Sequence, residues 1–472
     1  MRARWQFTGQ ERNWLLAGLF GLVIFGVNLE KRTALRHQPM TDLGVFSCAS
    51  WAAWHEQDIY QITDWHGWHY QYPPALAILF APLSHPAPTP PAKLQPGERR
   101  TAANTPWGYK TDDGNFFGLH RTNLRFFIIV GLWYMASVAF ALLAAQTVAC
   151  ILEQTKISSG PPVERLERRR WWALRLLPLA ACLGSIGTDW SRGQVDVLML
   201  MALAMGLYFG VSRQQAASGV LLAFPATVKL FPPFLLLYPI WRRRWRMAAG
   251  VLLGLFVFLL LLPACTLGPA RTAQLYRTWS QVLAKPALGA GTDTSRAKEL
   301  TGMNSTDNQS LLAAIHNWRY HEIPRRERPP EPSPVEREAV YAAGVLLLAG
   351  IAIAAGFRSS DSPRDYLLVN GLLIGLALVV SPIVHNYYYL LMLPLIASLL
   401  DSALPRQASD KTNWKIVGPI LFFTATDLLA RLPGIGGRLR DWGLPLLSLL
   451  SLLLAGAVVL FQRREVPVEP LR

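Results

Sequence analysis

Long apolar segments dominate the sequence and constrain its fold more than any other feature. About 20 apolar helical residues cross the hydrocarbon core of a bilayer, and shorter segments cross when their ends snorkel. Only helices and closed barrels satisfy their backbone hydrogen bonds in lipid. Eleven segments qualify, at about residues 14–29, 124–148, 172–187, 194–211, 216–240, 247–265, 338–357, 365–380, 384–401, 414–430 and 442–461. We therefore predict an all-α polytopic membrane protein with about 11–12 transmembrane helices.

Composition supports this prediction. Only 16% of the 472 residues are charged, against roughly 25% in soluble proteins, and 51% are apolar. The abundance of Trp, Phe and Tyr excludes a disordered chain. The four cysteines, Cys48, Cys150, Cys182 and Cys265, have neither the spacing of a zinc site nor that of a disulfide framework.

The net charge of +16 would suggest a nucleic-acid partner in a soluble protein. In membrane proteins, Lys and Arg instead concentrate in cytoplasmic loops. With both termini cytoplasmic, the predicted inner loops hold 21 Lys and Arg in 79 residues, and the outer regions hold about 23 in about 190. The first apolar run lacks a small-residue cleavage site, so we interpret it as a retained helix. We expect a lipid bilayer as partner and no nucleic acid.

This sidedness requires a break within residues 216–240. A single crossing there would place the cluster Trp241-Arg-Arg-Arg-Trp-Arg246 outside. Pro225, Pro232 and Pro233 disfavour a straight helix. We predict two short helices that enter and return, with Lys229 at the tip.

Two outer loops are large, at residues 30–123 and 266–337. In the first, residues 42–54 and 72–82 are too short to span and carry interfacial aromatics, so we expect helices lying in the membrane surface. Proline-rich residues 85–118 are typical of a flexible insertion. We assign residues 1–401 to the main membrane domain, and residues 402–472 to C-terminal transmembrane helices with a short basic cytoplasmic tail.

Unusual polar residues collect at the predicted outer membrane boundary. They lie in Thr41-Asp42, Tyr72-Pro73-Pro74, Asp189 to Gln194, Lys229, Asn308-Gln309-Ser310 and Ser381 to Asn386. Asp42 precedes the first surface helix. It either caps that helix by accepting backbone N–H groups or acts as a general base for a hydroxyl acceptor, and the two roles are compatible.

Lys229 and Arg192 are candidate phosphate ligands. A lysine within an apolar segment is costly unless it is paired or hydrated, so Lys229 either snorkels or binds a phosphate. Arg192 either binds the same anion or caps the turn between two spans. We interpret Asp196 as a structural partner of Arg192.

The remaining candidates surround these charges. His385, after the Ser381-Pro382 turn, either donates to a leaving phosphate or bonds a carbonyl of its own turn. The residues expected to line a substrate cavity are Tyr72, Gln194, Asn308, Gln309 and Asn386.

Metal and nucleotide binding find little support. Glu56-Gln57-Asp58 and His66-Gly67-Trp68-His69 offer ligands for a divalent cation, but we favour solvated surface for both. The sequence has no Asp-x-Asp, Walker or convincing Rossmann motif. We expect no resident cofactor and no tightly bound metal.

Several of these motifs recur in one order in a known family. They are Asp42 with Ala49 to Ala53, Asp58-Ile59-Tyr60, Tyr72-Pro73-Pro74, Gly193-Gln194, Gly219 to Lys229-Leu-Phe-Pro232, Trp241-Arg-Arg-Arg-Trp, Asn308-Gln309-Ser310 and Ser381-Pro382. Over about residues 14–401, this ordered set resembles glycosyltransferase family 87. Its known members are bacterial polyprenyl-phosphate-mannose-dependent α-(1,2)-mannosyltransferases of the GT-C superfamily.

The resemblance implies a GT-C-like fold and a hexosyltransferase. The enzyme would move a hexosyl group from a polyprenyl-phosphate sugar to a lipid or glycan hydroxyl on the outer face of a bacterial inner membrane. Mannosyl is the hexosyl group that the family favours. Asp42 inherits the role of general base, Lys229 lies near the donor phosphate, and the Asn308-Gln309-Ser310 loop lines the cavity.

The chain departs from the family at Glu56, Asp196 and Val384-His385-Asn386, which leaves the sugar and the acceptor open. The alternative function is a transporter or flippase of a lipid-linked or anionic substrate, because a broken helix with a lysine suits a substrate path. The absence of an internal repeat and the collection of polar residues at one face disfavour that alternative.

Overall fold

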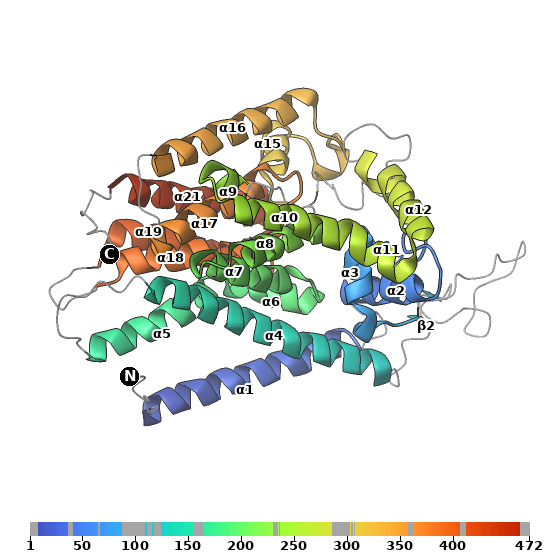
Figure 1. Cartoon of the computed structure of the whole chain (residues 1–472), viewed down its shortest axis with the longest axis horizontal. Coiled ribbons are helices and arrows are strands. Elements are labelled where there is room, and N and C mark those ends of the chain that lie inside the picture. The colour runs from blue at the N-terminus through green and yellow to red at the C-terminus, as the bar shows by residue number, and fades with distance from the viewer. Residues whose placement is uncertain are drawn as a thin grey trace, which may run out of the picture. The chain divides into compact units, whose positions relative to one another are not determined.

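The computed structural model describes residues 8–35, 41–64, 67–86, 109–110, 116–117, 124–154, 164–229, 235, 237–285, 303, 305, 307–356, 362–405 and 412–462 (Figure 1). Its described strands are Tyr109–Lys110 and Phe116–Phe117, which pair antiparallel. Nearly all of the predicted insertion, and with it the predicted flexibility, lies outside the described residues. The chain divides into unit 1 (Met1–Tyr70, Ala77–Val138 and Trp190–Gln194) and unit 2 (Gln71–Leu76, Ala139–Asp189 and Val195–Arg472).

Helices form at all eleven predicted apolar segments. They are α1 (Gly9–Arg32), α4 (Leu124–Glu153), α5 (Glu164–Ala181), α6 (Leu183–Arg192), α7 (Asp196–Val211), α8 (Gln215–Lys229), α9 (Leu237–Trp241), α10 (Trp245–Phe256), η3 (Val257–Leu261), α11 (Leu262–Leu267), α16 (Pro334–Gly356), α17 (Pro363–Val380), η6 (Asn386–Met392), α18 (Leu393–Ala403), α19 (Trp414–Leu429) and α21 (Leu444–Gln462). The shorter elements α12 (Pro269–Trp279), η4 (Ser280–Ala284), α15 (Leu311–Arg319), η5 (Arg325–Glu327) and α20 (Ile435–Asp441) lie between them.

Six helices in the described part of the chain are long and apolar enough to cross a membrane. They confirm the predicted class, an all-α polytopic membrane protein. Other apolar helices, such as α7 with 16 residues and α18 with 11, are shorter than a full span. The total of 11–12 crossings therefore stays a prediction.

In unit 1, α1 packs against the beginning of α4. The Tyr134 hydroxyl donates to the Leu22 carbonyl at 2.8 Å, and the Tyr134 ring stacks on Phe25. Trp14 and Phe20 on α1 are exposed, at 71% and 66% of their surface. An exposed apolar surface of this kind suits a helix that faces lipid.

The two predicted surface segments are helical and largely buried. The first forms α2 (Leu43–Trp54), where every residue except Trp51 and Trp54 is buried. The second forms α3 (Pro74–Leu79) and η1 (Ala81–Leu83), and α3 is buried except at Leu79. Both predicted helices therefore form, and other parts of the protein cover them. Their position in the membrane surface stays a prediction.

In unit 2, α17 forms the core. Ser362 accepts a hydrogen bond from the Asp365 N–H and Pro363 takes the first turn, so the helix begins there. All residues from Asp365 to Val379 are buried, and α16, α18 and α21 pack against the helix. A helix that is apolar on all sides needs such burial.

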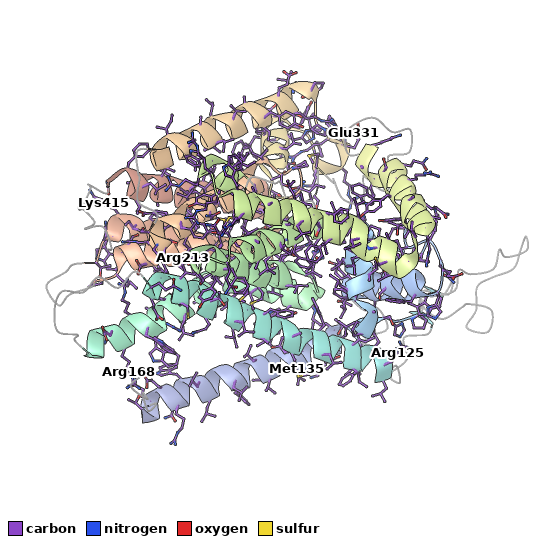
Figure 2. The ribbon with its side chains drawn as sticks, in the orientation of Figure 1. Arg125, Met135, Arg168, Arg213, Glu331 and Lys415 are labelled. Carbon is purple, nitrogen blue, oxygen red and sulfur yellow. The ribbon has the colours of Figure 1, made fainter. Side chains whose placement is uncertain are left out.

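The predicted break in residues 216–240 is confirmed. α8 continues through Pro225, ends at Lys229, and lies antiparallel to α7 with Lys229 against Asp196 at the start of α7. Arg244 then donates to the Gly210 carbonyl at the other end of α7, at 3.3 Å. Arg213, in the turn from α7 to α8, marks that end in Figure 2. α8 thus runs from one end of α7 to the other, and Arg244 lies back at the end from which α8 started.

Small residues bring α8 and α10 into close contact. A Cβ atom on Gly219 would lie 2.1 Å from the Met247 carbonyl oxygen and 2.6 Å from the Val251 nitrogen. Further along, a Cβ on Gly254 would lie 2.8 Å from the Ala223 Cβ. The two helices therefore run parallel, with their backbones nearly touching.

Gly219→Ala is expected to destabilise the protein by about 1–3 kcal/mol, because the new methyl group meets backbone atoms rather than a side chain that can move. Gly350→Ala is the control, since nothing lies within 4 Å of a Cβ there. Helix propensity favours alanine over glycine by up to about 1 kcal/mol. Thermal unfolding in detergent should show a lowered Tm for the first variant and an equal or raised Tm for the second. Equal shifts would contradict the close contact.

Candidate functional site

The Asp42 carboxylate, in unit 1, is held at the start of α2 but does not cap the helix. Thr41 Oγ1 accepts the Leu43 N–H at 3.2 Å, whereas the Asp42 side chain makes no capping hydrogen bond. Asp42 Oδ2 instead accepts a hydrogen bond from Gln194 Nε2. The capping interpretation of this side chain is therefore wrong. Its half-buried carboxylate is oriented by an amide donor, as a positioned base would be.

The end of α6 fixes this turn through its backbone. The Arg192 carbonyl accepts hydrogen bonds from the Asp42 N–H at 2.7 Å and from Thr41 Oγ1 at 3.0 Å. Gly193 has a φ of +65°, and a Cβ there would lie 2.7 Å from the Leu43 Cβ. Only glycine fits this position without strain. The side-chain role predicted for Arg192, phosphate binding, stays a prediction.

Lys229, in unit 2, is a buried ammonium group. Its side chain is 2% exposed, and Nζ lies 2.7 Å from Oδ2 of Asp196, whose side chain is fully buried. Nζ also lies 4.4 Å from the ring centre of Tyr388, 4.9 Å from that of Tyr387 and 5.8 Å from that of Tyr72. These are distances at which a cation is attracted to an aromatic face. Snorkelling is therefore excluded as the explanation of Lys229.

Asp196 pairs with Lys229, so the predicted pairing with Arg192 is wrong. The four-residue spacing from Arg192 to Asp196 would bring the side chains together only on a continuous helix. α6 ends at Arg192 and α7 begins at Asp196, with the Gly193 turn between them. The two residues therefore do not stand on one continuous helix, and the helical i,i+4 contact is absent.

A second carboxylate joins this cluster. Asp189 is fully buried, and its Oδ1 accepts the N–H of Asp196 at 3.1 Å. Within the part of the chain that the structure describes, Asp189 Oδ2 and Asp196 Oδ1 are buried without a hydrogen-bond partner. The sequence had placed Asp189 only in a polar segment. Its separation from Asp196 across a turn gave no signal that the two would meet.

His385 borders the rings around Lys229. Its imidazole stacks on Tyr387 with ring centres 5.3 Å apart, and meets Tyr388 edge-on at 5.8 Å. The structure thus places Tyr72 beside Lys229 and adds Tyr387 and Tyr388, through which His385 joins the cluster. The run of tyrosines after a Ser-Pro turn was the signal that could have identified them.

The Asn308-Gln309-Ser310 loop clamps the turn that carries His385. Asn308 Oδ1 accepts the Val384 N–H at 3.1 Å, and the Gln309 N–H donates to the Val384 carbonyl at 2.6 Å. Ser310 Oγ donates to the Pro382 carbonyl at 3.0 Å. The loop therefore positions the turn.

The cavity roles of this region are less direct. Asn308 and Gln309 are each 3% exposed, and Gln309 Nε2 donates to the Arg440 carbonyl. Asn386, 6% exposed, accepts a hydrogen bond from Ser185 Oγ through its own carbonyl. The predicted place of the three side chains in a substrate cavity stays a prediction.

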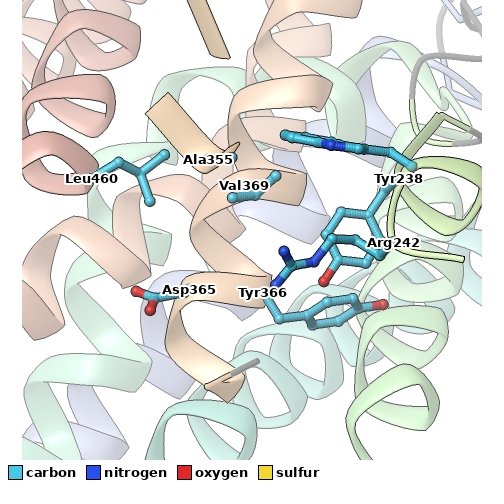
Figure 3. A pocket seen from close by; sticks show the side chains of 8 residues that line it. Tyr238, Arg242, Ala355, Asp365, Tyr366, Val369 and Leu460 are labelled. Carbon is cyan, nitrogen blue, oxygen red and sulfur yellow. The ribbon is translucent and has the colours of Figure 1, made fainter. Parts of the chain in front are cut away.

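A pocket of unit 2 lies away from these residues (Figure 3). It is lined by Tyr238, Trp241, Arg242, Ala355, Asp365, Tyr366, Val369 and Leu460. Tyr366 lies beside Gly210, at the end of α7 opposite to Asp196. The pocket contains none of the residues predicted for the functional site.

The model of glycosyltransferase family 87 matches residues 70–382. This range includes Tyr72, Asp189, Asp196 and Lys229, whereas Asp42 precedes it and His385 follows it. A comparison with curated proteins gave no match.

Proposed function

The chain belongs to glycosyltransferase family 87. We propose that it moves a hexosyl group, with mannosyl as the favoured sugar, from a polyprenyl-phosphate sugar to a hydroxyl of a lipid or glycan. The family makes the protein a membrane glycosyltransferase of the hexosyltransferase type. Family membership also favours transfer over the transporter alternative. The donor, the acceptor and the roles of individual residues below are our proposal.

The observation that carries the donor assignment is the buried Lys229 ammonium among three tyrosine rings. A buried cation attracts an anionic group, and lysine binds phosphate as a point charge. Tyrosine rings add surfaces against which a sugar or an isoprenoid unit packs. His385 and Arg192 are proposed as further ligands of the phosphate. The helices that expose apolar side chains to lipid suit a donor that enters from the bilayer.

The proposed reaction is a single displacement. Asp42 takes the proton of the acceptor hydroxyl, whose oxygen attacks the anomeric carbon of the sugar. The bond from that carbon to the phosphate oxygen breaks, polyprenyl phosphate leaves, and the anomeric configuration inverts. Lys229 stabilises the negative charge that grows on the leaving phosphate. We expect this reaction to need no tightly bound metal.

We place the reaction on the extracytoplasmic side of a bacterial inner membrane, with both termini cytoplasmic. Within unit 2, Lys229 and Asp196 lie at one end of α7, and Arg244 lies at the other, beside Gly210. Because arginines concentrate on the cytoplasmic side, this arrangement supports an outward-facing Lys229.

The test is an assay with purified protein in detergent. Short-chain polyprenyl-phospho-mannose serves as donor, with a panel of lipid and glycan alcohols as acceptors, in the presence and absence of EDTA. We expect transfer to at least one acceptor, release of polyprenyl phosphate and insensitivity to EDTA. Failure with this donor alongside transfer from another polyprenyl-phosphate hexose would change the sugar. Failure with all such donors would overturn the proposal.

A further inference from the structure

The Lys229 cluster already contains its own anion. Oδ2 of Asp196 lies 2.7 Å from Nζ of Lys229 and forms an ion pair with it, and both side chains are buried. Asp189 brings a second carboxylate to the same place through its bond to the Asp196 N–H. A phosphate that binds to Lys229 therefore meets the Asp196 carboxylate at close range, and like charges in buried surroundings repel strongly.

We propose that Asp196 is an intramolecular competitor for the donor phosphate: it holds Lys229 in the resting enzyme and gives it up when a lipid phosphodiester binds. This inference rests on the function proposed above and adds a residue that sets affinity for donor and product. Asp196 acts through Lys229, so it is a positioning residue.

Proton uptake follows from the exchange. When the phosphodiester takes the ammonium group, Asp196 is left with Asp189 and without its counter-ion. A buried carboxylate without a counter-ion binds a proton from water rather than staying charged. Besides Asp189, the ionisable group that contacts Asp196 is Lys229 from α8. The ionisable groups around Lys229 are Tyr72 before α3 and Tyr387 and Tyr388 of η6, and His385 contacts the last two. Donor binding is therefore expected to strengthen as pH falls.

Competition also gives a reason for product release. Transfer converts a phosphodiester with one negative charge into a phosphomonoester that carries up to two, and the second charge would hold the product more tightly to Lys229. When Asp196 gives its proton back to water, the carboxylate returns to the ammonium group and displaces that product. Without the competitor, polyprenyl phosphate is expected to accumulate on the enzyme and inhibit it.

The experiment measures binding of farnesyl methyl phosphate to the purified full-length protein by titration calorimetry. This phosphodiester keeps one charge between pH 6 and pH 8, so the ligand itself adds no pH dependence. Phosphatidylglycerol and inorganic phosphate, in separate arms, distinguish an isoprenoid phosphate from a phospholipid head group and from free phosphate. Asp196→Asn is expected to bind the probe about tenfold more tightly, a typical size for coupling between two ligands. Asp196→Asn should also raise inhibition of transfer by farnesyl phosphate.

Asp401→Asn is the matched control. Asp401 is also a buried aspartate of unit 2, and it pairs with Arg170 and Arg364. Asp401→Asn also removes one buried negative charge, but one that pairs with Arg170 and Arg364 and not with Lys229. It should leave the affinity for the probe unchanged. The wild-type protein provides a test that needs no variant. Titration in two buffers of different ionisation enthalpy should show uptake of about one proton per bound probe.

The outcomes separate the two proposals. If the wild type transfers sugar but Asp196→Asn gains no affinity for the probe, the role of Asp196 is overturned and the proposed function stands. The same holds if the wild type transfers sugar but takes up no proton when it binds the probe. If Asp196→Asn fails to fold, the proton count decides. Tighter binding of phosphatidylglycerol than of the isoprenoid probe also contradicts the inference. Absence of both transfer and binding for every isoprenoid phosphate overturns the proposed function itself.

Discussion

Asp42→Asn is expected to reduce the kcat of sugar transfer by about 10²–10⁴-fold, the contribution of a general base. The amide is nearly the same size as the carboxylate but cannot accept a proton from the acceptor hydroxyl. The hydrogen bond from Gln194 can be kept by the amide oxygen, so the start of α2 should retain its geometry. Folding and donor binding are expected to stay close to those of the wild type. Steady-state transfer and binding of farnesyl methyl phosphate measure the two effects separately.

Glu56→Gln serves as the control for this variant. Glu56 is an exposed carboxylate just after α2, the helix that Asp42 precedes. Its loss should leave the transfer rate within about twofold of the wild type, since surface changes away from the reacting atoms have small effects. Near-normal transfer by Asp42→Asn would remove Asp42 from the mechanism, whatever Glu56→Gln shows.

Lys229→Ala is expected to raise the KM for the donor by about 100-fold or more. The loss corresponds to about 2.7 kcal/mol, within the range measured when one partner of a buried hydrogen-bonded charge pair is removed. The variant also leaves Asp196 buried without its counter-ion, and a buried pair broken in this way costs about 3–5 kcal/mol of stability. A low Tm is therefore expected together with weak binding.

A double variant separates these effects. Lys229→Ala with Asp196→Asn removes both charges, so the Tm should recover while donor binding stays weak. The double-mutant cycle compares Tm and the affinity for farnesyl methyl phosphate across the four proteins. Wild-type affinity in either protein that lacks Lys229 would exclude this residue as a phosphate ligand.

The helices were predictable because a long apolar segment is recognised from its own residues, and in lipid it must be helical to satisfy its backbone hydrogen bonds. The break after Lys229 was predictable too, since prolines and the arginine cluster at 241–246 both required it. The burial of α2 could not be predicted, because composition shows how apolar a helix is and not what packs around it. An apolar segment of 12 residues suits the membrane surface and a packed interior equally well.

Single residues of the candidate site, such as Lys229, could be predicted from the sequence, but the residues that contact them could not. Lys229 drew attention because a charge in an apolar segment is costly. Its partner Asp196 stands 33 residues earlier, and no local spacing connects the two. Tyr387 and Tyr388 were similarly hidden, since an aromatic side chain is ordinary in such a segment until a cation is found beside it.

The clamp on the His385 turn has an evolutionary consequence. Its bonds end on main-chain atoms: the carbonyl of Pro382 and the N–H and carbonyl of Val384. Main-chain atoms are common to nearly every amino acid, so mutation of the side chain at 385, which is not buried as Val384 is, leaves this attachment intact. Under the proposed function, position 385 is therefore one where evolution can try new side chains toward the substrate while the turn stays in place.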